Sequence, residues 1–199
     1  MPITVRRAYG SDVPAIKAVH LDSMIHGYPF LCPRHLSTHA DADETRIRHT
    51  ESVFVAVHNF KEIIGFFEVM PTQQDGVGKI HSLFVCSAFW GRRVGTRLLN
   101  DAEQRLCLEG YHTGELWVFS GNKKGGMFYE KRGWKKTGHA KSTDWPGLDG
   151  VKCYKLQKTL QQVKWFEGYE RYTCQRTLLF AFLAGLAGIL ILCSSSKRC

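Results

Sequence analysis

The sequence predicts an α/β domain followed by an apolar C-terminal segment. Two stretches predict the domain, 79–109 and 115–134, because each consists of an apolar strand, a glycine-containing turn and a helix. A third observation is the run from Thr177 to Cys193, which is seventeen residues long and contains no charge. We therefore expect the 199 residues to form one domain of ordinary size and an appendage.

The composition limits the classes of partner. The chain has a net charge of +9, which suits nucleic acid, an anionic membrane or an anionic cofactor. It contains no zinc-finger pattern, no basic zipper and no basic strand interleaved with aromatic residues, so we expect no nucleic-acid partner. Its seven cysteines include no C-x-x-C pair, which argues against a disulfide framework and a metal site and fits a reducing compartment.

The N-terminal part predicts a strand and a helix. Residues 3–7 alternate in polarity, as a strand does, and Ser11 or Asp12 is placed to cap a helix that has Pro14 in its first turn. The apolar face of this helix is predicted to contain Val13, Ile16 and Val19. Residues 22–40 hold two prolines and three histidines and predict a broken helix or loop, and 44–49 predict a short charged helix.

The middle of the chain predicts three strands and a long helix. Strands are expected at 52–57 and 63–70, and a turn at 73–78 leads into a central strand at 80–86. The turn 90–96 follows, and it combines glycine with arginine. Apolar residues then recur at helical spacing, at Val94, Leu98, Leu99, Ala102, Leu106 and Leu108. Such a turn directs backbone N–H groups and a helix dipole toward a phosphate-bearing ligand.

The second strand, turn and helix carry a more specific pattern. A short strand at 115–119 precedes the run from Gly121 to Trp134, and a closing pair of strands is expected at 135–138 and 151–156. This part of the chain is similar to the GNAT superfamily of acyl-CoA N-acyltransferases, in which an asparagine after the fifth strand precedes Phe-Tyr-Glu-Lys-x-Gly-aromatic. The matching residues are Asn122, Phe128, Tyr129, Glu130, Lys131, Gly133 and Trp134.

The resemblance covers residues 1–160 approximately and has consequences for fold and activity. It implies a GNAT-like mixed sheet of six to seven strands flanked by helices. It also implies transfer of an acetyl group from acetyl-CoA, as co-substrate, to a primary amine of a protein or small molecule, without a covalent intermediate or a metal. Members often bind the acceptor with the region equivalent to 22–40, although a loop packed on the core is an equally good interpretation.

The resemblance also implies a phosphate-binding motif, Gln/Arg-x-x-Gly-x-Gly/Ala, and this chain departs from it twice. Aligned on Gly95, the motif has Trp90 in place of Gln/Arg and Arg93 in place of the middle glycine. Either Arg93 points outward and Arg92 supplies the charge, or binding is weak. The residues expected to bind the cofactor are Phe84, Val85, Arg92, Arg93, Val94, Gly95, Thr96, Asn122 and Tyr129, with the Val85 N–H polarising the thioester carbonyl.

The catalytic residues follow from the same resemblance. Tyr129 matches the family tyrosine that protonates the coenzyme thiolate, and the alternative is an aromatic residue packed in the core. Asn122 is expected to cap a helix, to bond the pantetheine arm, or to do both. The general base stays open between His81, on the central strand and facing opposite to Ser82, and Glu68 on the preceding strand, with Glu115 a weaker candidate. Cys86 and Cys107 are interpreted as structural thiols.

The apolar run predicts a membrane anchor. A helix over 177–193 spans roughly 25 Å, close to a hydrocarbon core, and Arg176 and Lys197 flank it with positive charge. A buried helix would ordinarily show a polar face, and this run has none. We therefore expect a juxtamembrane linker at 161–176, a transmembrane helix at 177–193 and a short tail at 194–199.

The expected setting is a single-pass membrane protein whose catalytic domain faces the cytosol. Its lipid partner is contacted through 177–193, and the sequence does not select one membrane. The second hypothesis is a catalytically impaired module that binds acyl-CoA or a protein partner while tethered to a membrane. Trp90 and Arg93 motivate this alternative.

Overall fold

The computed structural model describes residues 3–29, 31, 36, 52–143 and 148–161. The chain divides into two compact units, 1–162 and 163–199, and all described residues belong to the first. The helix predicted at 44–49 and the anchor predicted at 177–193 lie outside the described residues. Within the described residues, no helix is long and apolar enough to cross a membrane.

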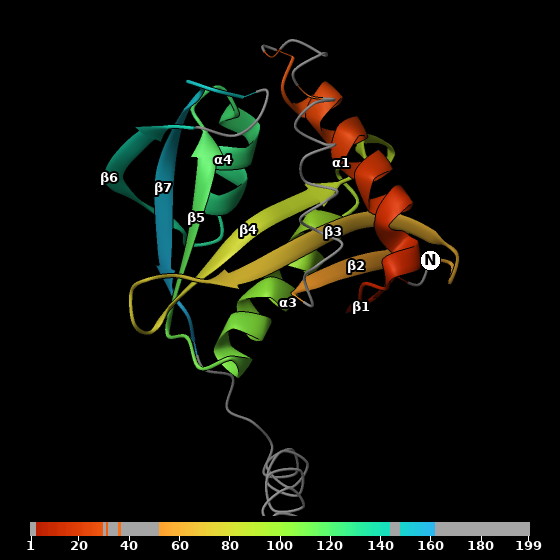
Figure 1. Ribbon diagram of the computed structural model, residues 1–199, viewed down its shortest axis with the longest axis horizontal. Helices are drawn as coiled ribbons and strands as arrows, with labels where there is room; N and C mark the ends of the chain where they lie inside the picture. The colour runs from red at the N-terminus through yellow and green to blue at the C-terminus, as the bar shows by residue number, and fades with distance from the viewer. Residues whose placement is uncertain (1–2, 30, 32–35, 37–51, 144–147, 162–199) are drawn as a thin grey trace, which may run out of the picture. The chain divides into compact units, whose positions relative to one another are not determined.

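The domain is built on a seven-stranded mixed sheet, as predicted (Figure 1). Its spatial order is β1-β2-β3-β4-β5-β7-β6, and only β4 and β5 are parallel. The strands are β1 (Ile3–Arg7), β2 (Val53–His58), β3 (Glu62–Pro71), β4 (Val77–Val85), β5 (Thr113–Phe119), β6 (Lys135–Ser142) and β7 (Lys152–Thr159).

Helices cover both faces of the sheet, which explains why β2 and β3 are apolar on both sides. Helix α1 (Val13–Gly27) packs on one face through the predicted Val13, Ile16 and Val19. Helix α3 (Val94–Leu108) packs on the other face, and its predicted apolar residues are buried except Leu108 in the last turn. The short α4 (Lys123–Glu130) lies beside β5 and β7 (Figure 1).

The start of α1 differs from the prediction. Asp12 stands at the N-cap position, but its carboxylate makes no cap hydrogen bond to α1. It accepts instead from the Arg6 guanidinium, at 2.6 and 3.1 Å, and from the Tyr9 N–H at 2.8 Å. The hydrogen bond from Arg6 lowers the pKa of Asp12, and this ion pair fastens β1 to the beginning of the helix. The N-cap hydrogen bond expected from Ser11 or Asp12 was therefore wrong, because a partner from β1 takes the carboxylate.

The two parallel strands touch only at their beginnings. Their register pairs Val77 with Thr113, Gly78 with Gly114 and Lys79 with Glu115, and it ends there. Both glycines are required by close packing, since a Cβ on Gly78 would lie 2.6 Å from Leu106 and one on Gly114 would lie 2.8 Å from Trp134. Beyond this point the strands separate, as Figure 1 shows.

A β-bulge in β4 accompanies the separation. Glu68 pairs with Ser82 and Val69 with Ile80, so His81 is the extra residue of β4. A bulge bends the strand that contains it and increases its twist. The bulge lies two residues beyond Lys79, where the pairing with β5 ends, and so it bends β4 within the separated part of the strand.

Candidate active site

The separated edge of β4 carries two backbone amides. The Cys86 N–H donates to the Ile64 carbonyl at 2.9 Å, and the register places Phe84 opposite Phe66. Because N–H directions alternate along an antiparallel pair, the N–H groups of Leu83 and Val85 point away from β3 and toward β5. The Val85 amide thus lies at the gap between the two strands.

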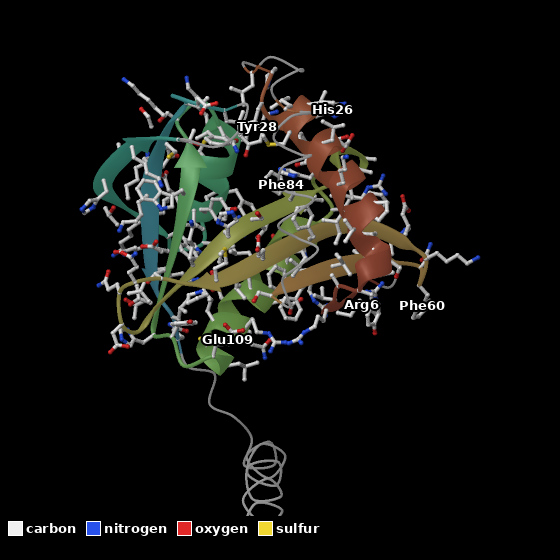
Figure 2. The ribbon with its side chains drawn as sticks, viewed as in Figure 1. Arg6, His26, Tyr28, Phe60, Phe84 and Glu109 are labelled. Atoms are coloured by element: carbon white, nitrogen blue, oxygen red, sulfur yellow. The ribbon has the colours of Figure 1, made fainter. Side chains whose placement is uncertain are left out.

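A cavity of about 480 Å³ occupies this gap. It is lined from the α1 face by Tyr28 and Phe84, which Figure 2 labels, and from the other face by the beginnings of α3 and α4. The predicted site residues that line it are His81, Phe84, Val85, Arg93, Val94, Gly95, Thr96, Asn122 and Tyr129. Glu68 and Arg92 are not among its lining residues.

The described residues that line the cavity carry a net positive charge. Five of its lining residues are lysine or arginine, and among the described residues that line it none is aspartate or glutamate. The cationic residues are Lys79, Arg93, Lys124, Arg132 and Lys141. This composition suits an anionic ligand, whose charge each nearby cation stabilises.

The turn before α3 resolves the choice between the two arginines. Arg93 occupies the N-cap position in a left-handed conformation (φ 63°) and lines the cavity, while α3 has no side-chain cap. The Arg92 guanidinium lies over the Phe89 ring, 5.3 Å from its centroid and outside the cavity lining. Trp90 lines the cavity, and its indole N–H donates to the Val85 carbonyl at 2.7 Å.

Comparison with known proteins identifies the family. Residues 18–134, more than half of the chain, match the model described as the acetyltransferase (GNAT) family. The chain belongs to the GNAT acetyltransferase family.

Solved structures of GNAT-type proteins share the fold at low sequence identity. The PaiA N-acetyltransferase of Thermoplasma acidophilum, solved in complex with coenzyme A, has a TM-score of 0.66 at 19% identity, over 80% of this chain and 99% of that one. YjaB of Escherichia coli has a TM-score of 0.64 at 22% identity, over 79% and 97% of the two chains. Comparison with curated protein sequences gives no match.

In this GNAT domain, Tyr129 lines the cavity. The residue is half-buried between Phe128 and Trp134, with ring centroids 5.1 and 6.2 Å away. Among the described residues its hydroxyl has no hydrogen-bond partner, although its ring packs against the core. Burial raises the pKa of Tyr129 well above its usual value, so the hydroxyl stays protonated at neutral pH and is a weaker acid than an exposed tyrosine.

Asn122 is a helix cap and a link between two helices. Its Oδ1 accepts the Gly125 N–H at 2.8 Å, and its Nδ2 donates to the Tyr28 hydroxyl at 3.0 Å. Burial raises the pKa of Tyr28 to about 12. Asn122 lines the cavity, but both ends of its amide are committed to protein partners.

The three candidate bases occupy different places. His81 and Ser82 both line the cavity. Strand alternation predicted that they face opposite sides of the sheet, but the β-bulge at His81 interrupts this alternation. Glu68 is only 1% exposed and does not line it. Glu115 accepts from the Lys155 ammonium at 3.3 Å. By position, His81 is the candidate that a substrate in the cavity reaches.

The thiols behave as expected of structural cysteines. Burial raises the pKa of both Cys86 and Cys107, which disfavours the thiolate that a nucleophile requires. Neither residue lines the cavity.

Arg132 is a site residue that the sequence interpretation did not select. Its guanidinium lies 3.9 Å from the Phe128 ring centroid and donates to the Phe128 carbonyl at 2.7 Å and to the Thr96 hydroxyl at 2.6 Å. Its Nε is buried and has no hydrogen-bond partner among the described residues. Arg132 lies in the turn after α4, which ends at Glu130, so helical spacing did not mark it.

Proposed function

We propose that this domain transfers the acetyl group of acetyl-CoA to a primary amine, with the thioester lying across the gap between β4 and β5. The observation that carries the proposal is the separation of these two strands after Lys79 and Glu115. It opens a cavity that reaches both faces of the sheet, so that a cofactor and an acceptor can approach one another from opposite faces.

The cofactor phosphates are proposed to bind at the beginning of α3. Helix N-termini stabilise anions through free N–H groups and the helix dipole, and α3 has no side chain that takes these groups. Arg93, Lys124 and Arg132 add positive charge around the same end of the cavity. Arg132 also joins α4 to α3 through Thr96, which holds this charge close to the helix terminus.

The reaction has four requirements: the thioester carbonyl is polarised, the amine attacks it, the amine loses a proton, and the departing thiolate gains one. The thioester carbonyl oxygen accepts from the Val85 N–H, which stabilises the negative charge that develops during attack. The neutral amine attacks the carbonyl carbon, and the carbon–sulfur bond breaks as the tetrahedral intermediate collapses. The proton lost by the amine passes to His81, directly or through water, and the Tyr129 hydroxyl protonates the departing thiolate.

The first test is titration of the full-length chain, in detergent, with acetyl-CoA. Saturable binding, followed by acetyl transfer to members of an amine panel, is the expected result. Binding without transfer would favour the second candidate function, an impaired acyl-CoA-binding module, for which the departures at Trp90 and Arg93 are the specific observation. No saturable binding would reject both the enzyme and the acyl-CoA-binding module and leave only a protein-interaction module.

We also propose that residues 177–193 anchor the domain to a membrane, with the domain in the cytosol. The support is the seventeen-residue uncharged run and its basic flanks. Removal of 177–199 is expected to move the protein from the membrane fraction to the soluble fraction. A truncated protein that stays with membranes would contradict the anchor.

A further inference from the structure

The face of the sheet toward α1 carries an aromatic residue beside the gap. A Cβ on Gly114 would point at Trp134 and Leu160, which belong to the α3 face. Because side chains alternate along a strand, Trp117 points to the opposite face, the one covered by α1. Trp117 lines the cavity there, on the side away from the beginning of α3.

A lysine lies over this tryptophan. The Lys141 ammonium is 4.8 Å from the Trp117 ring centroid, and Lys141 also lines the cavity. Lys155 lies 6.0 Å from the same ring, but it is paired with Glu115 at 3.3 Å. Among the described residues, Lys141 has no carboxylate partner.

A second lysine contributes to the potential at this place. The thiol of Cys153 lies on the same face, since the register joins Cys153 to both Phe119 and Lys141. Burial raises the pKa of Cys153, and the ammonium groups of Lys141 and Lys79 oppose that rise. The ammonium groups of Lys141 and Lys79 therefore both contribute to the electrostatic potential at Cys153, which lines the cavity.

We infer that the acceptor is an amine that also carries a carboxylate, and that Lys141 binds this carboxylate beside Trp117. The inference rests on the proposed function and names its acceptor class. The acceptor's carbon chain packs on the indole, and its amino group extends toward His81 and the gap. Lys141 is exposed as a residue, but its ammonium lies over the indole, where a carboxylate accepts a charge-assisted hydrogen bond from it.

The same charges argue against the opposite class of acceptor. A polycationic amine needs carboxylates to offset its charge, and none is present among the described residues that line the cavity. The cofactor phosphates do not compete for Lys141, because the proposed phosphate site lies at the beginning of α3 on the other face of the sheet. The lysine is therefore assigned to the acceptor.

The test uses the full-length chain in detergent and matched acceptors. A series of straight-chain ω-amino acids of increasing length is compared with the corresponding methyl esters, which keep the amine and remove the carboxylate charge, and with spermidine. We expect one or more acids to be acetylated with a kcat/KM about tenfold above that of the ester, since removing one end of a charge-assisted hydrogen bond costs about this factor. Esters or spermidine that react better than every acid would overturn the inference.

Two lysine variants of one strand separate a specific contact from general charge. Lys141→Gln is expected to raise the KM for the preferred acid about tenfold and to leave its ester and acetyl-CoA unchanged. Lys136→Gln removes the same charge from β6, but Lys136 pairs with Glu130 at 2.9 Å and does not line the cavity. This variant is therefore expected to leave the KM values for the acid and for the ester unchanged. Equal losses for acid and ester in Lys141→Gln would overturn the inference.

Direct binding keeps this inference distinguishable from the proposed function. Titration with the acid and with its ester measures the carboxylate contact without any transfer. A preference for the acid that disappears in Lys141→Gln supports the carboxylate site even if acetyl-CoA does not bind. Acetyl-CoA binding with no preference for the acid retains the proposed function and rejects the carboxylate site.

Discussion

The two strand-to-helix connections at the gap have similar sequences and different structures. Both leave an apolar strand through a glycine-containing turn and begin a helix at the cavity. At the first, Arg93 stands in a left-handed conformation before α3, and no side chain caps the helix. At the second, Asn122 caps α4 and also bonds Tyr28.

From this difference in capping we infer a separate role for each connection. The beginning of α3 keeps its N–H groups available and is flanked by Arg93 and Arg132, so it suits the phosphates. The beginning of α4 is capped by its own asparagine, and this helix instead contributes Tyr129 to the cavity lining. One helix is thus proposed to bind the cofactor, and the other to supply the proton. The predictions below test this division, beginning with the largest expected effect.

Tyr129→Phe removes the proposed acid and keeps the ring. We expect kcat to fall about 100-fold, the lower end of the range for a general acid, with the acetyl-CoA Kd changed less than about twofold. Steady-state kinetics and calorimetric titration measure the two quantities. Tyr111→Phe is the control, since Tyr111 packs against the core and does not line the cavity. Equal changes in kcat and Kd would show that Tyr129 acts by packing.

Thr96→Glu places a carboxylate in the first turn of α3, where it pairs with Arg132 and repels phosphate. We expect the acetyl-CoA Kd to rise about 30-fold, because a negative charge is introduced beside the proposed anion site. Lys123→Glu is the matched control at the first residue of α4, and we expect it to change the Kd only slightly. A control that weakens binding as much as Thr96→Glu would remove the distinction between the two helices.

Asn122→Ala deletes the cap of α4 and its hydrogen bond to Tyr28. We expect a loss of about 1–2 kcal/mol in the free energy of unfolding, with the acetyl-CoA Kd changed less than about threefold. Denaturant titration measures the loss. Asn122→Asp keeps an oxygen for the Gly125 N–H and is expected to retain most of the stability. A tenfold rise in Kd without loss of stability would make Asn122 a direct cofactor ligand instead.

Arg93→Gly has the smallest expected effect, and the informative result is whether the free energy of unfolding rises or falls. A left-handed residue with a side chain costs about 1–2 kcal/mol, which exceeds the extra chain entropy that glycine brings to the unfolded state. We expect a net gain of about 0.5 kcal/mol in unfolding free energy and a modestly weaker affinity for acetyl-CoA. Arg92→Gly removes the same charge from a residue outside the cavity lining and should weaken affinity less, without a stability gain.

The local pattern of the sequence predicted the elements that depend on local physics. The spacing of Val13, Ile16 and Val19 gave the buried face of α1, because burial follows the helical period directly. The cap at Asn122 was likewise predictable, since an asparagine before a helix satisfies an N–H three residues away. The cap expected at Asp12 failed because Arg6, on a separate strand, competes for the carboxylate.

The sequence by itself predicted the family, the order of the described strands and helices, and nine of the residues that line the cavity. Only the tertiary structure decided that Arg93 lines it rather than Arg92, that Glu68 is buried outside it, and that Lys141 lies over Trp117. The reason is that periodicity and capping act within a few residues. The sheet order places β7 and then β6 beside β5, so residues far apart in the chain meet at one face.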